Sequence, residues 1–128
     1  MCIRDRHNAI KSHIIEGRLP VIAYPSDSYL GQVIEREVFF QLRAQLTIDR
    51  VAETSLTLAI LPMTVAGVGV GWLPDSLVAA DLASGLLTDL RDALPDCELS
   101  VMAIQLRDSE SIFKSEVWET VAAYIDHR

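Results

Sequence analysis

The spacing of apolar residues along the chain predicts short buried strands that alternate with amphipathic helices. Compact apolar runs closed by proline predict strands over residues 19–24 and 68–73, and short stretches that mix apolar and polar residues predict strands over residues 48–53, 86–90 and 98–107. Apolar positions three or four residues apart, preceded by cap residues, predict helices over residues 8–16, 29–45, 56–66 and 75–85 and from residue 108 or 109 onward. This alternation is typical of an α/β fold, with a mostly parallel sheet and helices on both of its faces.

The longest predicted helix, residues 29–45, has one broad apolar face and one exception. At about 100° per residue, the apolar face gathers Leu30, Val33, Ile34, Val38, Phe40 and Leu42. Phe39 points the opposite way, among polar and charged side chains. An aromatic ring on a polar face favours a contact with another subunit; the alternative is a second packed neighbour within the same chain.

Proline and glycine refine the element boundaries. Pro62 lies inside the helix predicted over residues 56–66 and should kink or shorten it, because proline removes a backbone hydrogen bond. Three glycines within residues 67–71 follow that helix and precede a strand, whereas a phosphate-binding loop leaves a strand and opens a helix. We therefore expect them to end the helix and to allow close backbone packing. Residues 94–96 have the composition of a linker.

Composition narrows the classes of function. Eleven basic and eighteen acidic residues give a formal net charge of −7, which disfavours a nucleic-acid-binding surface because phosphate neutralisation needs clustered cations. No apolar run reaches the roughly 18 residues of a membrane span, and no basic segment followed by an apolar stretch indicates secretion. Cys2 and Cys97 form neither a CxxC pair nor a disulfide framework, which fits a cytoplasmic protein.

The residue types that carry catalysis do not converge in this sequence. It holds no GxSxG elbow, no GKS or GKT phosphate loop, no HExxH and no paired cysteines. The three histidines, His7, His13 and His127, lie near the chain ends without the spacing of metal ligands. We therefore predict no enzyme activity, no metal site and no cofactor.

The turn between the first strand and the long helix, residues 24–29, is the strongest candidate site. It follows the carboxyl end of a strand, where open α/β sheets bind ligands, and it opens a helix whose free N–H groups favour anions. Ser26 and Ser28 add hydroxyl groups, and the two tyrosines of the turn offer walls. The alternative is that Ser26 or Ser28 serves only as an N-cap.

A second polar turn follows the next strand. Thr54 and Ser55 repeat the arrangement, and two polar helix N-termini on one sheet edge would suit a small anionic ligand better than either alone. Asp27 and Glu53 oppose a bare anion, so a mixed polar ligand stays open.

Several segments, in this order, resemble the effector-binding domain of LysR-type transcriptional regulators. They are LPVIAYP (19–25), SYL (28–30), AETS (52–55), VAGVGVGWLP (65–74) and DSLVAADLASGLL (75–87). The resemblance covers about residues 10–126. It implies a periplasmic-binding-protein-like (type 2) fold, with two α/β lobes around a ligand cleft, in which effector binding shifts the oligomer and transcription. Within the family, SYLG at residues 28–31 and GWLP at residues 71–74 are most similar to the hypochlorite-responsive regulators.

The resemblance implies a division of the chain and a set of site residues. Residues 7–92 would form most of the second lobe, residues 93–95 would lie near a crossover, and residues 96–128 would return to the first lobe as a strand and a helix. Effector-binding residues would be Pro25, Ser26, Asp27, Ser28, Thr54 and Ser55, with Phe39 as the candidate oligomer contact. The family's DNA-binding domain has no counterpart here, so only the parent protein, expected to be a homo-oligomer, would bind promoter DNA.

Some features depart from the family pattern. Pro62 interrupts a helix that is usually continuous, and the strand over residues 98–107 would lack sheet neighbours, so we predict a marginally stable chain that is prone to association. Met63 and Met102 would be oxidant targets in the hypochlorite subgroup, and the alternative for both is ordinary burial. Two other classes stay open, a solute-binding protein of a transport system and, less favoured, a small α/β enzyme.

The first six residues, MCIRDR, resemble the translation of a transposon-end adapter used in sequencing libraries. The alternative is a genuine short N-terminus. Because of the resemblance to an adapter, residues 1–6 are left out of the prediction of the fold.

Overall fold

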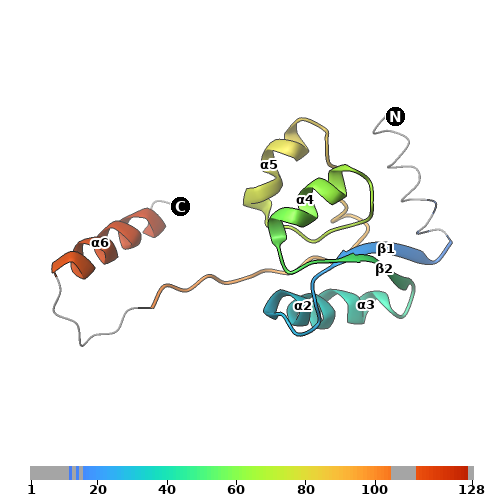
Figure 1. The fold of residues 1–128 in the computed structure, drawn as a ribbon, viewed down its shortest axis with the longest axis horizontal. Coiled ribbons are helices and arrows are strands. Elements are labelled where there is room, and N and C mark those ends of the chain that lie inside the picture. Colours follow the sequence, from blue (N-terminus) through green and yellow to red (C-terminus); the bar gives the residue numbers. More distant parts are fainter. Residues whose placement is uncertain (1–11, 13, 15, 105–111, 127–128) are drawn as a thin grey trace. The chain divides into compact units, whose positions relative to one another are not determined.

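The computed structural model describes residues 12, 14, 16–104 and 112–126. The chain divides into two compact units, residues 1–98 and residues 99–128, named unit 1 and unit 2 below. Unit 1 contains β1 (Arg18–Ala23), α2 (Tyr29–Ile34), the π-helical turn η1 (Glu35–Phe39), α3 (Phe40–Leu42), β2 (Thr47–Glu53), α4 (Thr57–Val65) and α5 (Asp75–Ala83), and unit 2 contains α6 (Ile112–Asp126) (Figure 1).

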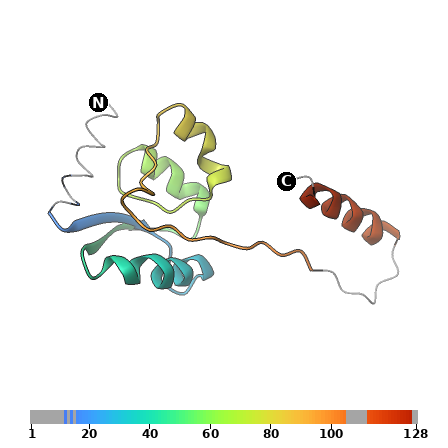
Figure 2. The ribbon, with the colours of Figure 1, turned by 180° about the vertical axis from the view of Figure 1, so that it is seen from behind.

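A parallel sheet lies at the centre of unit 1. β1 pairs with β2 from Arg18 opposite Thr47 to Ala23 opposite Glu53, and on its other edge it forms a parallel bridge to Val70. β1 is therefore the middle strand, and its residues Leu19, Val21, Ile22 and Ala23 are almost fully buried. The segment from α2 to α3 covers one face of this sheet, and α4 and α5 lie on the other (Figures 1 and 2). The predicted α/β fold, with a parallel sheet between layers of helix, is confirmed.

The strand predicted over residues 68–73 is reduced to the bridge at Val70. A Cβ atom on Gly69 would lie 2.9 Å from the carbonyl oxygen of Pro20, and one on Gly71 would lie 2.5 Å from Cγ2 of Ile60. The backbone thus passes from β1 to the side of α4 within three residues, which leaves no room for a longer ladder. The close packing predicted for these glycines is confirmed.

The long helix changes its hydrogen-bond pattern in the middle. Tyr29–Ile34 is α-helical, Glu35–Phe39 is a π-helical turn, and the helix ends at Leu42 rather than at residue 45. In the π turn the Phe40 N–H donates to the Glu35 carbonyl, five residues earlier. Residues five apart are thereby brought onto the same face, whereas an α-helix would place them about 140° apart.

The prediction that Phe39 lies on the polar face is wrong. Phe39 is 3% exposed and Phe40 is 76% exposed, so the two rings exchange their predicted places. The π turn causes this exchange, because it adds a residue between the buried pairs 33–34 and 38–39. The Phe39 ring packs edge-on against Trp72, with ring centroids 5.4 Å apart, so Phe39 is a core residue and not an exposed contact for a second subunit.

The helix α4 contains Pro62 and still continues for three residues beyond it. It is shorter by one residue at each end than the helix predicted over residues 56–66. Gly67, with φ of 76°, ends it as predicted. The helix α5 likewise matches its prediction and is followed by Gly85, also with φ of 76°.

The predictions for residues 86–96 need correction. Residues 86–90 form no strand, because the N–H groups of Leu86 and Leu87 both donate to the Asp81 carbonyl, over 2.9 and 3.1 Å, and hold the chain against α5. Residues 94–96 are not a linker either. Leu94 is 6% exposed within the core, and the chain leaves unit 1 after residue 98.

The described residues of unit 2 are an extended segment, residues 99–104, and α6 (Figure 1). Residues 99–104 are not in a strand, and residues 105–107 of the strand predicted over 98–107 lie outside the described residues. Met102 is 78% exposed, so the alternative of ordinary burial is wrong for this methionine. The apolar residues of α6 that face solvent within this unit are Val117, Trp118, Val121, Tyr124 and Ile125.

Several predictions lie largely outside the described residues. Of the helix predicted over residues 8–16, residues 12 and 14 are described and helical, and Gly17, with φ of 75°, follows it as a C-terminal glycine. The cap expected at residue 108 or 109 is not among the described residues. Within the described part of the chain, no helix is long and apolar enough to cross a membrane.

Candidate functional site

The two polar turns singled out from the sequence lie side by side at one edge of the sheet. Ala23 ends β1 opposite Glu53 at the end of β2, and the Thr54 N–H donates to the Ala23 carbonyl over 3.0 Å. Because the strands are parallel, the helices that follow them, α2 and α4, both begin at this edge. Residues 25–28 and 54–55 together are called the candidate edge below.

Ser28 fixes the shape of the first turn. Its hydroxyl donates to the Pro25 carbonyl over 2.7 Å and accepts from the Gly31 N–H over 3.0 Å, so it is the N-cap of α2. Its backbone N–H also donates to the Pro25 carbonyl, over 3.0 Å. The N-cap alternative therefore holds for Ser28, whereas Ser26 and Asp27 are exposed at the tip of the turn.

In the second turn, too, one hydroxyl group holds the backbone and the other faces solvent. The Thr54 hydroxyl accepts from the Leu56 N–H over 3.1 Å, which closes a side-chain turn before α4. Ser55 is exposed. Each turn thus has one hydroxyl that holds the backbone, on Ser28 or Thr54, and one that faces solvent, on Ser26 or Ser55.

Tyr24 forms the buried wall behind the candidate edge. Its side chain is 6% exposed, and its hydroxyl lies 3.2 Å from the Trp72 carbonyl and 3.3 Å from the Thr57 hydroxyl. Burial raises the pKa of Tyr24 above its ordinary value near 10, and the hydrogen bond with Thr57 acts in the opposite direction. Tyr24 therefore stays neutral near pH 7 and acts as a fixed hydrogen-bonding group. Tyr29, the second expected wall, is 72% exposed.

Sequence reasoning missed two participants at this wall. Thr57 is an ordinary first-turn residue of a predicted helix, and its proximity to Tyr24 arises only when α4 packs beside β1. Trp72 contributes its backbone carbonyl, which no residue pattern could single out. The one available signal was the buried aromatic residue directly before Pro25.

A shallow hollow of about 420 Å³ lies on the outer side of the long helix. Its walls are Ser26, Gln32, Glu35, Arg36, Phe40 and Arg43, so it shares only Ser26 with the candidate edge. Glu35 pairs with Arg43 and, over 2.9 Å, with Arg50, and Arg36 pairs with Glu37 over 2.7 Å. Because these cations already have carboxylate partners, the hollow offers no unpaired charge to an anion.

The described residues hold no group of three or more His, Cys, Asp or Glu side chains placed to bind a metal ion. The polar side-chain groups of the candidate edge are hydroxyls and one carboxylate, that of Asp27. Such groups can orient a small polar ligand by hydrogen bonding.

Comparison with known proteins identifies related sequences. A family model described as the LysR substrate binding domain matches residues 17–120. The chain is 25% identical over 95 residues to the HTH domain-truncated transcriptional regulator QseD of Escherichia coli O157:H7, covering 73% of this chain and 38% of that protein. It is also 25% identical over 95 residues to the HTH-type transcriptional regulator YjiE of Escherichia coli K12, covering 73% of this chain and 31% of that protein. The chain therefore spans about a third of the length of these curated relatives.

A solved structure shares the fold. It is the full-length structure of HypT from Salmonella typhimurium, named there as a hypochlorite-specific LysR-type transcriptional regulator. It superposes with a TM-score of 0.59 at 18% identity, covering 80% of this chain and 34% of that one. Together with the family match, this likeness agrees with the predicted periplasmic-binding-protein-like (type 2) fold.

Proposed function

The chain belongs to the LysR substrate-binding domain family, and on this premise we propose that unit 1 is the effector-binding lobe of a transcription regulator. The observation that carries the proposal is the juxtaposition of two polar helix N-termini, joined by the hydrogen bond from the Thr54 N–H to the Ala23 carbonyl. Parallel strands present their carboxyl ends, with free N–H groups behind them, to a single ligand position.

The candidate edge divides into groups that hold the turns and groups that meet the ligand. Ser28 and Thr54 keep the backbone in place through the hydrogen bonds described above. Ser26 and Ser55, which are exposed, would donate to a carboxylate or similar group of the effector. Asp27, beside them, would oppose a bare anion and accept from a hydroxyl or amino group, so we propose a mixed polar effector. Pro25 would pack against its apolar part.

Membership of the LysR family also supports a proposal for how the chain divides between the two lobes of the domain. On this proposal, residues 7–92 form most of the second lobe, residues 93–95 lie near the crossover with Leu94 still packed in the core of unit 1, and residues 96–128 return to the first lobe. The parent protein would be a cytoplasmic homo-oligomer that binds promoter DNA through a domain outside this sequence. The curated relatives are named as transcriptional regulators, which supports a sensing role without catalysis.

An oxidant-responsive regulator is the finer form of this proposal. Its support is the resemblance of residues 28–31 and 71–74 to the hypochlorite-responsive subgroup. If an oxidant is the signal, Met102, at 78% exposed, is reached more easily than the half-buried Met63.

Backbone amide chemical shifts of this chain, titrated with small carboxylates that also carry a hydroxyl or amino group, test the effector site, and inorganic phosphate serves as the bare anion for comparison. We expect shift changes to centre on residues 25–31 and 54–57. The double variant Ser26→Ala, Ser55→Ala should weaken that binding by about five- to 150-fold, because it removes two hydrogen bonds that each contribute about 0.5–1.5 kcal/mol. Its fold should be unchanged, since both side chains are exposed.

The matched control is Ser76→Ala, which removes an exposed serine of α5. It should leave the affinity unchanged. Shift changes that centre on the hollow around Phe40, with no effect of the serine double variant, would contradict the proposal.

A further inference from the structure

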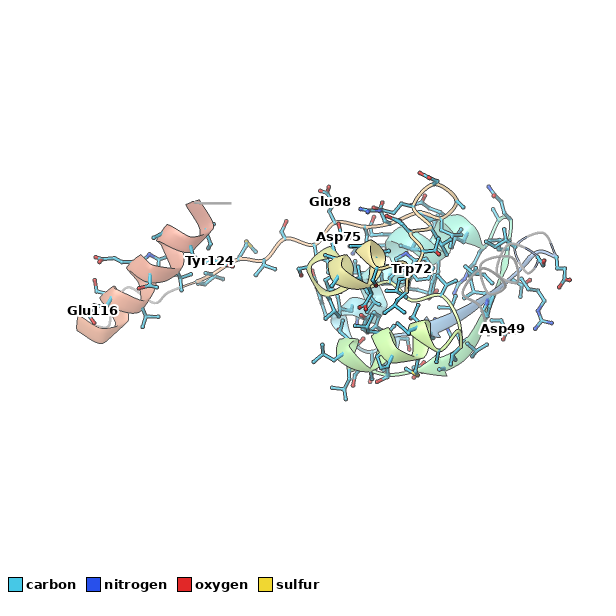
Figure 3. The ribbon with its side chains drawn as sticks, turned by 90° about the horizontal axis from the view of Figure 1, so that it is seen from above. Asp49, Trp72, Asp75, Glu98, Glu116 and Tyr124 are labelled. Carbon is cyan, nitrogen blue, oxygen red and sulfur yellow. The ribbon has the colours of Figure 1, made fainter. Side chains whose placement is uncertain are left out.

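Trp72 joins three parts of unit 1 that are far apart in the sequence. Its ring packs against Phe39, its carbonyl lies 3.2 Å from the Tyr24 hydroxyl, and its indole N–H donates to the Pro95 carbonyl over 2.9 Å. Figure 3 labels Trp72 inside unit 1 and Glu98 on the segment that leaves it. One residue therefore contacts the long helix, the wall of the candidate edge and the end of unit 1.

The contact with Tyr24 has a definite direction. A tyrosine hydroxyl has one proton, and a carbonyl oxygen can only accept, so Tyr24 donates to Trp72. The Thr57 hydroxyl must then donate to the Tyr24 oxygen. The backbone of Trp72 is thus tied to the residue directly before Pro25 and to the first turn of α4.

The contact with Pro95 is the last hydrogen bond between described residues before the chain leaves unit 1. Among hydrogen bonds between described residues, none involves the backbone of residues 96–98. The side chain of Leu94 is buried, and the Pro95 carbonyl accepts from the indole N–H, but four residues after Pro95 the chain enters unit 2.

We propose that Trp72 is a positioning residue that links the candidate edge to the exit of the chain from unit 1. A change at the Tyr24 hydroxyl is passed through the Trp72 carbonyl to its indole, and so alters how firmly residues 95–98 are held. A role of this link in regulation rests on the proposed function, because it requires that a ligand bind at the candidate edge. The link itself can be tested without a ligand.

The thiol of Cys97 is a probe for this link. It lies two residues after Pro95 and packs half-buried against the core, and burial, with Asp96 and Glu37 nearby, raises its pKa. Release of the segment would expose the thiol and increase its thiolate fraction, and both changes speed alkylation. A Cys2→Ser background leaves Cys97 as the only cysteine of the chain.

In this background we expect Trp72→Phe, which keeps a ring against Phe39 but lacks the N–H donor, to raise the rate of alkylation by iodoacetamide about two- to tenfold. Trp118→Phe, in unit 2, is the control and should leave the rate unchanged. An unchanged rate in a folded Trp72→Phe variant, checked by far-ultraviolet circular dichroism, would overturn the proposal.

Tyr24→Phe tests the link from the other end and serves if Trp72→Phe fails to fold. It should also raise the alkylation rate of Cys97, although Tyr24 has no direct role at Pro95. In the Trp72→Phe background the same change should have no further effect, because the route to Pro95 is already cut. An equal effect of Tyr24→Phe in both backgrounds, or none in either, would refute the link. The serine titration is a separate measurement, so failure of either proposal is distinguishable from failure of the other.

Discussion

At the scale of single residues, Gly31 shows why the candidate edge needs a position without a side chain. A Cβ atom at Gly31 would lie 1.9 Å from the Pro25 carbonyl oxygen and 2.9 Å from Oγ of Ser28. That carbonyl accepts from both the N–H and the hydroxyl of Ser28, so the turn cannot move away without losing these bonds. The first turn of α2 and the shape of the edge therefore depend on each other.

Gly31→Ala tests this dependence through the sign of its effect. In an open helical position, replacing glycine by alanine stabilises a protein by roughly 0.5–1 kcal/mol. Here we expect the free energy of unfolding, measured with urea, to fall by about 1–3 kcal/mol because of the clash with Pro25. Gln32→Ala, an exposed neighbour in the same helix, should change it by no more than about 0.5 kcal/mol. Stabilisation by Gly31→Ala would contradict the observed close approach.

At the scale of elements, the π turn decides which phenylalanine belongs to the core. Regular α-helical spacing would bury Phe40 and expose Phe39, whereas the structure shows the reverse. The i to i+5 hydrogen bonding of η1 accounts for the difference, because the pair 38–39 follows the pair 33–34 by five residues.

Alanine variants of the two adjacent phenylalanines test which of them is buried in the core. Phe39→Ala should lower the free energy of unfolding by about 3–5 kcal/mol, because it empties the contact with Trp72. Phe40→Ala should change it by no more than about 0.5 kcal/mol. Urea unfolding gives both values, and Phe39→Leu can replace the alanine variant if the latter does not fold. A larger loss from Phe40→Ala than from Phe39→Ala would show that the helix is regular in solution.

The sequence predicts an element well when the residues of that segment and its immediate neighbours determine its structure. β1 and β2 agree with their predictions to within one residue. β1 is a short apolar run between Gly17 and Pro25, whereas β2 mixes apolar and charged residues and ends before Thr54 and Ser55. The strand expected over residues 86–90 is absent because the N–H groups of Leu86 and Leu87 donate to the Asp81 carbonyl. This carbonyl belongs to α5, so the sequence of residues 86–90 alone does not reveal the contact.

The candidate edge follows the same rule. Parallel strands must bring their carboxyl ends together, so the proximity of residues 25–28 and 54–55 was predictable. The shift at Phe39 was not predictable, because residues 38–40 are all apolar and the α-helical period places Phe40 rather than Phe39 on the buried face. The contacts of Tyr24 with Thr57 and with the Trp72 carbonyl depend on tertiary packing and left no pattern to recognise.

At the scale of the whole molecule, the two units differ in what they bury. The described hydrophobic core lies within unit 1, from Ile14 to Cys97. Within unit 2, the extended segment exposes Val101 at 97% and Ile104 at 85%, and α6 exposes a further apolar face. Exposed apolar chain that lacks a sheet partner tends to pair with other molecules. We therefore expect the association predicted from the sequence to occur through the exposed apolar residues of unit 2.

Removing residues 99–128 should therefore separate folding from association. We expect the 1–98 chain to keep its urea midpoint, because its core is retained, and to remain monomeric in size-exclusion chromatography with light scattering. The full chain should show a mass that grows with concentration. Val101→Lys with Ile104→Lys in the full chain should reduce that growth, since lysine on an unpaired strand blocks edge pairing. A full chain that stays monomeric at every concentration would show that the apolar surface of unit 2 is covered in solution, and would contradict the prediction.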